Sequence, residues 1–215
     1  MKVPLRYQAS EFDCGPTALI NAISYLYDSE EIPPDFVKRI YDFSLDDYLT
    51  GRAYHSGTTM QSMRYAADWF GRYAAGTGFP IRTAFCAGEQ VHLREDSPIL
   101  SCLREGGAVV IRVILECDHY VTLTGLDGTY LEVFDPYYMD EPILPEGVLA
   151  VSGEEKRMNR KVPIAVMDSE SRGDYAFCSP GDRCAVLIYR TQEEKIQLPG
   201  WEGFDASGLL QPRDS

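Results

Sequence analysis

The sequence predicts an α+β fold in which N-terminal helices pack on a C-terminal antiparallel sheet. Before Gly106-Gly107, apolar residues recur at the spacing of one helix face, whereas after these glycines the chain has short apolar runs rich in branched residues. Helical segments therefore come first and strands second, which is the order of an α+β domain. The 215 residues suffice for one domain, or for one domain with an appended subdomain.

Four helices are expected before the sheet. In the first, residues 18, 19, 22, 23 and 26 are apolar and share one face; Pro16 suits the first turn, so Cys14 falls at the helix N-terminus. The second helix is expected at about 35–43 and the third at 59–70, where Gly71 would end it. Ser97-Pro98 begins the fourth, and Gly106-Gly107 ends it.

Four strands are expected, at 108–115, 119–124, 130–135 and 184–189. The second and third flank Leu126-Asp127-Gly128, which is a hairpin signal. The fourth follows a turn at 179–182 and is expected as an added edge of the same sheet. Residues 136–160, rich in Pro, Gly and charge, are expected to form a loop, and the tail at 198–215 has too little periodicity for an assignment.

Charge and composition exclude several classes of function. Lys and Arg number 20 against 33 Asp and Glu, so the net charge of −13 would repel nucleic-acid phosphates and anionic lipid surfaces. We therefore expect no nucleic-acid partner and no membrane partner. The chain has no signal-peptide core and no stretch near the ~20 apolar residues of a spanning helix. A cytoplasmic protein with reduced cysteines, Cys178 and Cys184 included, is expected.

Neither a metal nor an organic cofactor is expected. Three histidines and the lack of a Cys-x-x-Cys pair argue against a structural zinc site, and no Gly-rich phosphate loop precedes a helix. His55 and His92 have no acid or cysteine at ligand spacing and are expected to be solvated loop residues. Asp118 should point away from the face that carries His119, as a solvated charge.

Cys14 and Gln8 form the first half of a candidate catalytic site. A cysteine at a helix N-terminus feels the helix dipole and unpaired backbone N–H groups, and both favour the thiolate, which is the nucleophilic form. Gln8 lies six positions upstream, close enough to donate to an oxyanion beside the Cys14 N–H. Taken alone, a cysteine on the apolar side of a helix is more often a small buried hydrophobe, and Gln8 is a loop glutamine.

His119 and Asp135 form the second half, and the hairpin register decides whether they meet. A three-residue loop at 126–128, with Gly128 in the left-handed region, pairs 125 with 129 and places His119 directly opposite Asp135, with Cβ atoms about 4.5–5.5 Å apart. A two-residue loop at Asp127-Gly128 would put the two side chains on opposite faces. Such a pair could also be a surface ion pair. Together the four residues supply nucleophile, oxyanion donor, base and orienter for covalent acyl transfer.

The segments that carry these residues resemble a known family. QASEFDCGPTAL at 8–19 is similar to the catalytic-cysteine segment of the bacteriocin-processing cysteine peptidases, a papain-clan family that cleaves after double-glycine leaders. The resemblance extends to Gly57-Thr58-Thr59-Met60 with Ala66-Ala67, and to Gly107–Ile114, His119-Tyr120-Val121 and Phe134-Asp135-Pro136. It spans residues 5 to 140. Members that process leaders are usually joined to a membrane transporter, whereas in this chain 79 other residues follow Pro136.

The resemblance implies a papain-like cysteine peptidase fold with Cys14 as nucleophile, His119 as general base, Asp135 as the orienter of His119 and Gln8 as the oxyanion-hole residue. It further implies a catalytic domain at 1–140, and we expect 141–215 to be a C-terminal extension packed on that domain. Tyr137, Tyr138, Trp69 and Trp201 could line the cleft, although aromatic residues more often pack in cores.

The leading functional hypothesis is a hydrolase that cleaves a peptide or another amide through an acyl-enzyme. Two alternatives stay open: an acyltransferase in which an amine replaces water, and a non-catalytic module that binds peptides in the same cleft. The partner in each case is a peptide or a small amide. The acidic charge should favour basic or neutral peptides over acidic ones.

Overall fold

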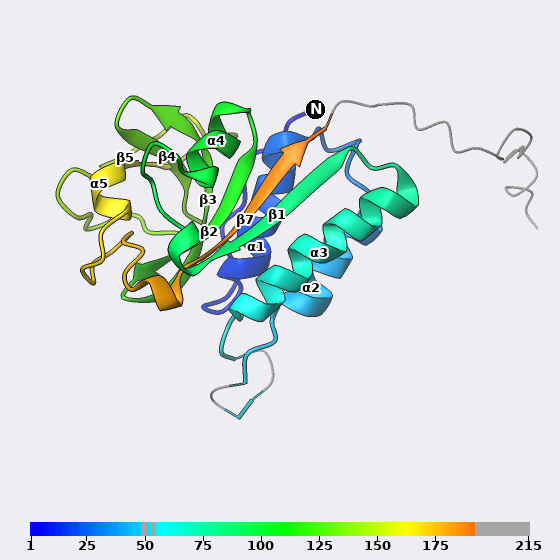
Figure 1. Ribbon diagram of the computed structural model, residues 1–215, viewed down its shortest axis with the longest axis horizontal. Helices are drawn as coiled ribbons and strands as arrows, with labels where there is room; N and C mark the ends of the chain where they lie inside the picture. Colours follow the sequence, from blue (N-terminus) through cyan, green and yellow to red (C-terminus); the bar gives the residue numbers. More distant parts are fainter. Residues whose placement is uncertain (49–50, 53–54, 192–215) are drawn as a thin grey trace, which may run out of the picture.

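The computed structural model describes residues 1–48, 51–52 and 55–191, which fold into a seven-stranded sheet with helices on both faces (Figure 1). The strand order is β1-β7-β2-β3-β4-β6-β5, and every neighbouring pair is antiparallel. The strands are β1 Ile81–Ala87, β2 Ala108–Leu115, β3 Cys117–Asp127, β4 Tyr130–Phe134, β5 Leu149–Ala150, β6 Arg160–Pro163 and β7 Cys184–Arg190. The expected combination of helices with an antiparallel sheet is confirmed.

The helices are α1 Cys14–Leu26, α2 Pro34–Ser44, α3 Met60–Thr77, α4 Pro98–Arg104 and α5 Ile164–Met167, with 3-10 turns at Gly88–Gln90 and Pro180–Asp182. Helix α3 runs past Gly71, where we expected it to end. A mid-helix glycine costs only about 1 kcal/mol relative to alanine, and continued packing of α3 on α2 and β1 outweighs it. The helix ends instead at Gly78, which takes the left-handed conformation (φ 74°) that glycine adopts without strain.

The sheet separates two hydrophobic cores because its strands alternate. In β2, Ala108 and Val110 face the core formed with α1, α2 and α3, while Val109, Ile111 and Val113 face the core formed with α4 and α5. Strand β7 alternates in the same way. Burial on both faces explains why these two segments read as continuous apolar runs in the sequence.

Strand β7 lies inside the sheet, between β1 and β2, so the expectation that it adds an edge was wrong. The reason is β1, which the sequence did not predict: the segment Ile81–Ala87 has one arginine, two alanines and only two buried residues, too weak a pattern to be recognised. Strand β6 begins at Arg160, where the expected loop ends, and pairs with β4.

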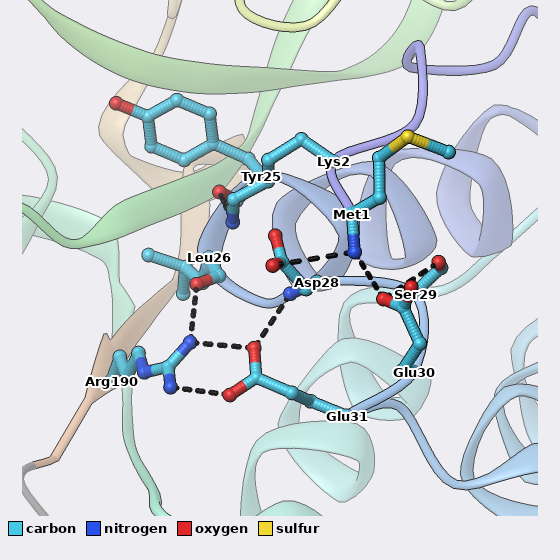
Figure 2. Close-up of polar contacts among 9 residues, drawn as sticks. All are labelled: Met1, Lys2, Tyr25, Leu26, Asp28, Ser29, Glu30, Glu31 and Arg190. Carbon is cyan, nitrogen blue, oxygen red and sulfur yellow. Dashed lines mark hydrogen bonds and ion pairs between the residues drawn. The ribbon is translucent and has the colours of Figure 1, made fainter.

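Exposed charges connect the C-terminal end of β7 to the N-terminal region (Figure 2). Arg190 makes a two-pronged ion pair with Glu31 (2.9 and 2.5 Å) and donates to the Leu26 carbonyl at the end of α1 (3.2 Å). The amino group of Met1 pairs with Asp28 and Glu30 beside it. Among the described residues, no helix is long and apolar enough to cross a membrane.

Candidate active site

Cys14 is the first residue of α1, and its side chain is buried (7% exposed). Asp13 before it shapes the turn into the helix, because its carboxylate accepts from the backbone N–H groups of Ala9 (3.1 Å) and Ser10 (2.7 Å). Gly15 after it faces Thr58, and a Cβ at Gly15 would lie 2.2 Å from the Thr58 hydroxyl oxygen. Only glycine therefore lets the loop before α3 approach the start of α1 this closely.

His119 and Asp135 meet: the ring nitrogen Nε2 lies 2.8 Å from Asp135 Oδ1. The hairpin register that we expected is nevertheless wrong. The turn pairs Asp127 with Tyr130, not 125 with 129, although Gly128 does take the left-handed conformation (φ 62°).

A β-bulge brings the two side chains back to one side of the strand pair. The register shifts between Leu123 and Gly125, where β3 contains one extra residue, and beyond the bulge Thr122 pairs with Phe134. Continuing this pairing puts Asp135 opposite position 121, so His119 is its diagonal neighbour on the same side. The register prediction failed twice, because the turn lies later in the chain than expected and because a bulge cannot be counted from a hairpin signal; the two errors partly cancel, so the predicted contact exists.

Asp135 is fully buried and every oxygen of its carboxylate has a donor. Oδ1 accepts from His119 and from the Tyr137 backbone N–H (2.8 Å), and Oδ2 accepts from the Tyr175 hydroxyl (2.7 Å). Asn159 clamps the backbone on the other side, since its Oδ1 accepts from Asp135 N and its Nδ2 donates to Asp135 O, both at 2.8 Å. The carboxylate is thus held in one orientation.

These contacts favour a charged pair. Burial lowers the pKa of His119, but the hydrogen bonds with Asp135 and Cys14 and the charges of both groups outweigh it and raise that pKa to about 10. Burial would raise the pKa of Asp135, yet the His119 contact, its charge, and the Tyr137 and Tyr175 donors lower it. Because Nε2 is engaged with Asp135, Nδ1 is the nitrogen left for the Cys14 sulfur.

Gln8 lies in the same cavity as Cys14 and His119. Its backbone N–H donates to the Pro136 carbonyl (2.8 Å), which fastens the segment before α1 to the residue after Asp135. Its side-chain Nε2 donates to the Ser10 carbonyl (2.8 Å), and Oε1 is buried without a hydrogen-bond partner. An amide nitrogen carries two N–H groups, so one remains for a substrate oxygen.

The cavity has a volume of about 370 Å³ and two kinds of wall. Its apolar wall includes Tyr137, Met139 and Ile143, the last of which is 96% exposed. The remaining lining carries five carboxylates and, among the described residues, no lysine or arginine: Glu11, Glu116, Asp118, Glu141 and Asp174. A second cavity of about 580 Å³ is also lined by Cys14, so this residue borders both cavities.

Of the other sequence candidates, Asp118 and His55 line the cavities at Cys14, whereas His92 belongs to neither lining. Asp118 is exposed and pairs with Arg112, as expected of a solvated charge, and His55 is exposed. His92 was wrongly expected to be solvated: it is buried, and its carbonyl accepts from Ser97, the residue that caps α4. In the described part of the chain no cluster of His, Cys, Asp and Glu could hold a metal ion.

Of the four aromatic residues expected in the cleft, Tyr137 lines the cavity. Trp69 instead packs against Phe36 and Tyr73 in the helical core, and Tyr138 packs edge-on against Tyr7. Trp201 lies outside the described residues, as does the tail at 198–215. All six cysteines are free, including Cys178 and Cys184.

Two residues of this site were missed by sequence reasoning, Asn159 and Tyr175. Nothing in the local sequence separates Tyr175 from the other tyrosines, of which the chain has 14 in all. It occupies the left-handed region (φ 66°), and its hydroxyl donates to Asp135 Oδ2. Only the folded chain brings a residue 40 positions away to Asp135.

No family model matches the chain, and no curated protein matches it by sequence. Among solved structures, the chain is similar to a double glycine motif protease from an AMS/PCAT transporter, determined in complex with the leader peptide. The TM-score is 0.43 and the identity 15%, over 87% of this chain and 91% of that one. This neighbour is of the class that the segments around Cys14 and His119 resemble.

Proposed function

We propose that this protein is a cysteine peptidase of papain-like arrangement, which cleaves a peptide or related amide through a Cys14-His119-Asp135 triad. The observation that carries the proposal is the buried imidazole held between a carboxylate at 2.8 Å and a thiol at a helix N-terminus. A structural cysteine has no need of an oriented histidine beside it. The order of helix-borne cysteine, strand-borne histidine and following aspartate supports the papain-like arrangement.

In this mechanism His119 takes the thiol proton, and the Cys14 sulfur attacks the substrate carbonyl carbon. The oxyanion is bound by the Cys14 backbone N–H, one of the N–H groups at a helix start that lack an intrahelical partner, and by the free N–H of Gln8. His119 gives its proton to the leaving nitrogen as the carbon–nitrogen bond breaks. Water then attacks the thioester, passes its proton to His119, and Cys14 leaves as thiolate.

The first test is the rate of Cys14 alkylation by iodoacetamide between pH 5 and 9, read by peptide mass spectrometry. Cys117 is an internal control: it is exposed and lies in the same cavity, but partial burial and the negative charges of Cys14, Asp118 and Glu116 raise its pKa. We expect Cys14 to react faster than Cys117 at pH 6 although it is the more buried thiol.

His119→Gln should abolish this advantage, since glutamine can still donate to Asp135 but cannot hold a proton near Cys14. Tyr27→Phe, which removes a buried hydroxyl bonded to the Pro80 carbonyl far from the site, should keep it. Slow alkylation of Cys14 that does not depend on His119 would refute the triad and favour the peptide-binding module.

The substrate preference follows from the lining of the cavity. Five carboxylates next to the sulfur should favour peptides with a lysine or arginine near the scissile bond over acidic ones. The first substrates to test are peptides that contain Gly-Gly, as the family resemblance implies. Versions with a lysine and versions with a glutamate beside this motif should be compared by kcat/KM, at low and at high salt. Partition of the acyl-enzyme toward an added amine, beyond mass action, would indicate the acyltransferase instead.

A further inference from the structure

The strongest unexplained feature near the site is the phenol of Tyr175. It is fully buried, comes from the segment between α5 and β7, and gives its hydroxyl proton to Asp135 Oδ2 at 2.7 Å. Asp135 Oδ1 accepts from two donors, whereas among the described residues Asp135 Oδ2 accepts from Tyr175 alone. Without it, half of a buried carboxylate would lack a partner.

The backbone around Tyr175 is anchored to the strand next to His119. Tyr175 N donates to the Ile114 carbonyl (2.6 Å), and Ile114 N donates to the Ala176 carbonyl (3.0 Å). The residue before Ile114, Val113, pairs directly with His119 across β2 and β3. Strand β2 therefore sets the position of both the phenol and the imidazole, one on each side of Asp135.

In the part of the chain that the structure describes, two charged or titratable side chains from other elements act on Asp135 and Tyr175. His119 comes from β3 and contacts Asp135, while Arg160 comes from the start of β6 and contacts the Tyr175 hydroxyl. Cys14, at the start of α1, contacts His119. Burial and the negative charge of Asp135 raise the pKa of Tyr175, so the phenol remains a hydrogen-bond donor throughout the range in which the protein would work.

We propose that Tyr175 is a positioning residue of the triad: its hydroxyl holds the Asp135 carboxylate in the orientation that aims His119 at Cys14. The inference rests on the proposed function and deepens it, because it adds a residue beyond position 140 to the support of a triad whose members lie between Cys14 and Asp135. Asn159, which clamps the Asp135 backbone, belongs to the same support.

Tyr175→Phe removes this hydroxyl and keeps the ring. The Asp135 carboxylate then loses a hydrogen-bond donor, so its pKa rises. Because fewer donors neutralise its negative charge, the carboxylate stabilises the protonated form of His119 more strongly. The His119 titration should therefore move to higher pH. Because a carboxylate without this donor aims the imidazole less well at Cys14, kcat/KM should fall about ten- to hundredfold. A purely structural role would lower thermal stability and leave the titration in place. Tyr27→Phe is the matched control for a buried tyrosine hydroxyl.

The decisive measurement is an NMR titration of the His119 ring in Cys14→Ala protein, with and without Tyr175→Phe. This background makes the result independent of whether Cys14 is a nucleophile, so failure of the inference can be told apart from failure of the peptidase proposal. Difluorotyrosine at position 175, a stronger donor that preserves the fold, should shift the titration to lower pH. Equal His119 titrations in all three proteins would overturn the proposal.

Discussion

Two polar networks of this protein use the same kinds of bond in opposite surroundings. Around Asp135, a carboxylate, an imidazole and a phenol lie where water is excluded. Around Arg190, a guanidinium and the carboxylate of Glu31 form an equally short two-pronged contact, but both side chains are about 40% exposed (Figure 2). The comparison shows that hydrogen-bond length alone does not tell how much a network contributes to stability or to chemistry.

The physical difference is the alternative open to each group when its partner is removed. An exposed carboxylate exchanges an arginine for water and salt ions, so its ion pair contributes little. A buried carboxylate has no such replacement, and removing its partner leaves an uncompensated charge. We therefore expect substitutions at the two networks to differ greatly, both in stability and in chemistry.

The largest effect is expected from Cys14→Ala, which should reduce turnover of any substrate to the uncatalysed background. Thermal stability should change little beyond the loss of one small buried side chain, because no buried charge loses its only partner. Activity assays with circular dichroism melting curves check both parts. Retained turnover in the folded variant would contradict the nucleophile assignment.

Asp135→Ala should come next, and it should affect both stability and chemistry. The substitution leaves His119, the Tyr137 N–H and the Tyr175 hydroxyl without their common acceptor, at a cost of about 3–5 kcal/mol. Urea unfolding measures this loss. Asp118→Ala, an exposed aspartate on the same strand as His119, is the control and should cost far less. Similar losses in the two variants would erase the contrast between buried and exposed networks.

The buried network should also make stability depend on alkaline pH. The folded pKa of His119, about 10, lies above its ordinary value near 6.5, so its contribution is complete below about pH 6.5 and is lost as pH rises toward 10. Urea midpoints of the parent and of His119→Gln should therefore converge as pH rises. A constant difference between them from pH 6 to 10 would show that His119 is not protonated in the folded protein.

The smallest effect is expected at the exposed network. The ion pair with Arg190 lowers the pKa of Glu31 to about 2, so its contribution is present above about pH 4.3 and is lost only as pH falls toward 2. Because the pair is exposed, Glu31→Gln should shift the melting temperature by no more than about 2 °C at neutral pH, and by less in 1 M salt. A shift as large as that of Asp135→Ala would mean that the Arg190 contact fastens β7 far more strongly than its exposure suggests.

Much of the architecture could be predicted from the chain because the signals are local. Helix α1 follows from its apolar face and Pro16, β2 and β7 from their branched apolar runs, and the β3–β4 turn from Asp127-Gly128. The sequence carried weaker signals for how the strands are ordered in the sheet. Strand β1 has no clear alternation of buried and exposed residues, and without it β7 was expected at an edge rather than between β1 and β2.

The sequence by itself determined the chemistry available here: a cysteine at a helix N-terminus, a strand histidine, an aspartate before a proline and an upstream glutamine. Only the tertiary structure decided how they meet. The bulge after Leu123 puts His119 and Asp135 on one side, and the fold brings Tyr175 beneath the carboxylate from 40 residues away. The reason is that side-chain type and helical or strand periodicity are local properties, whereas register and the partners of a buried charge depend on how distant segments pack.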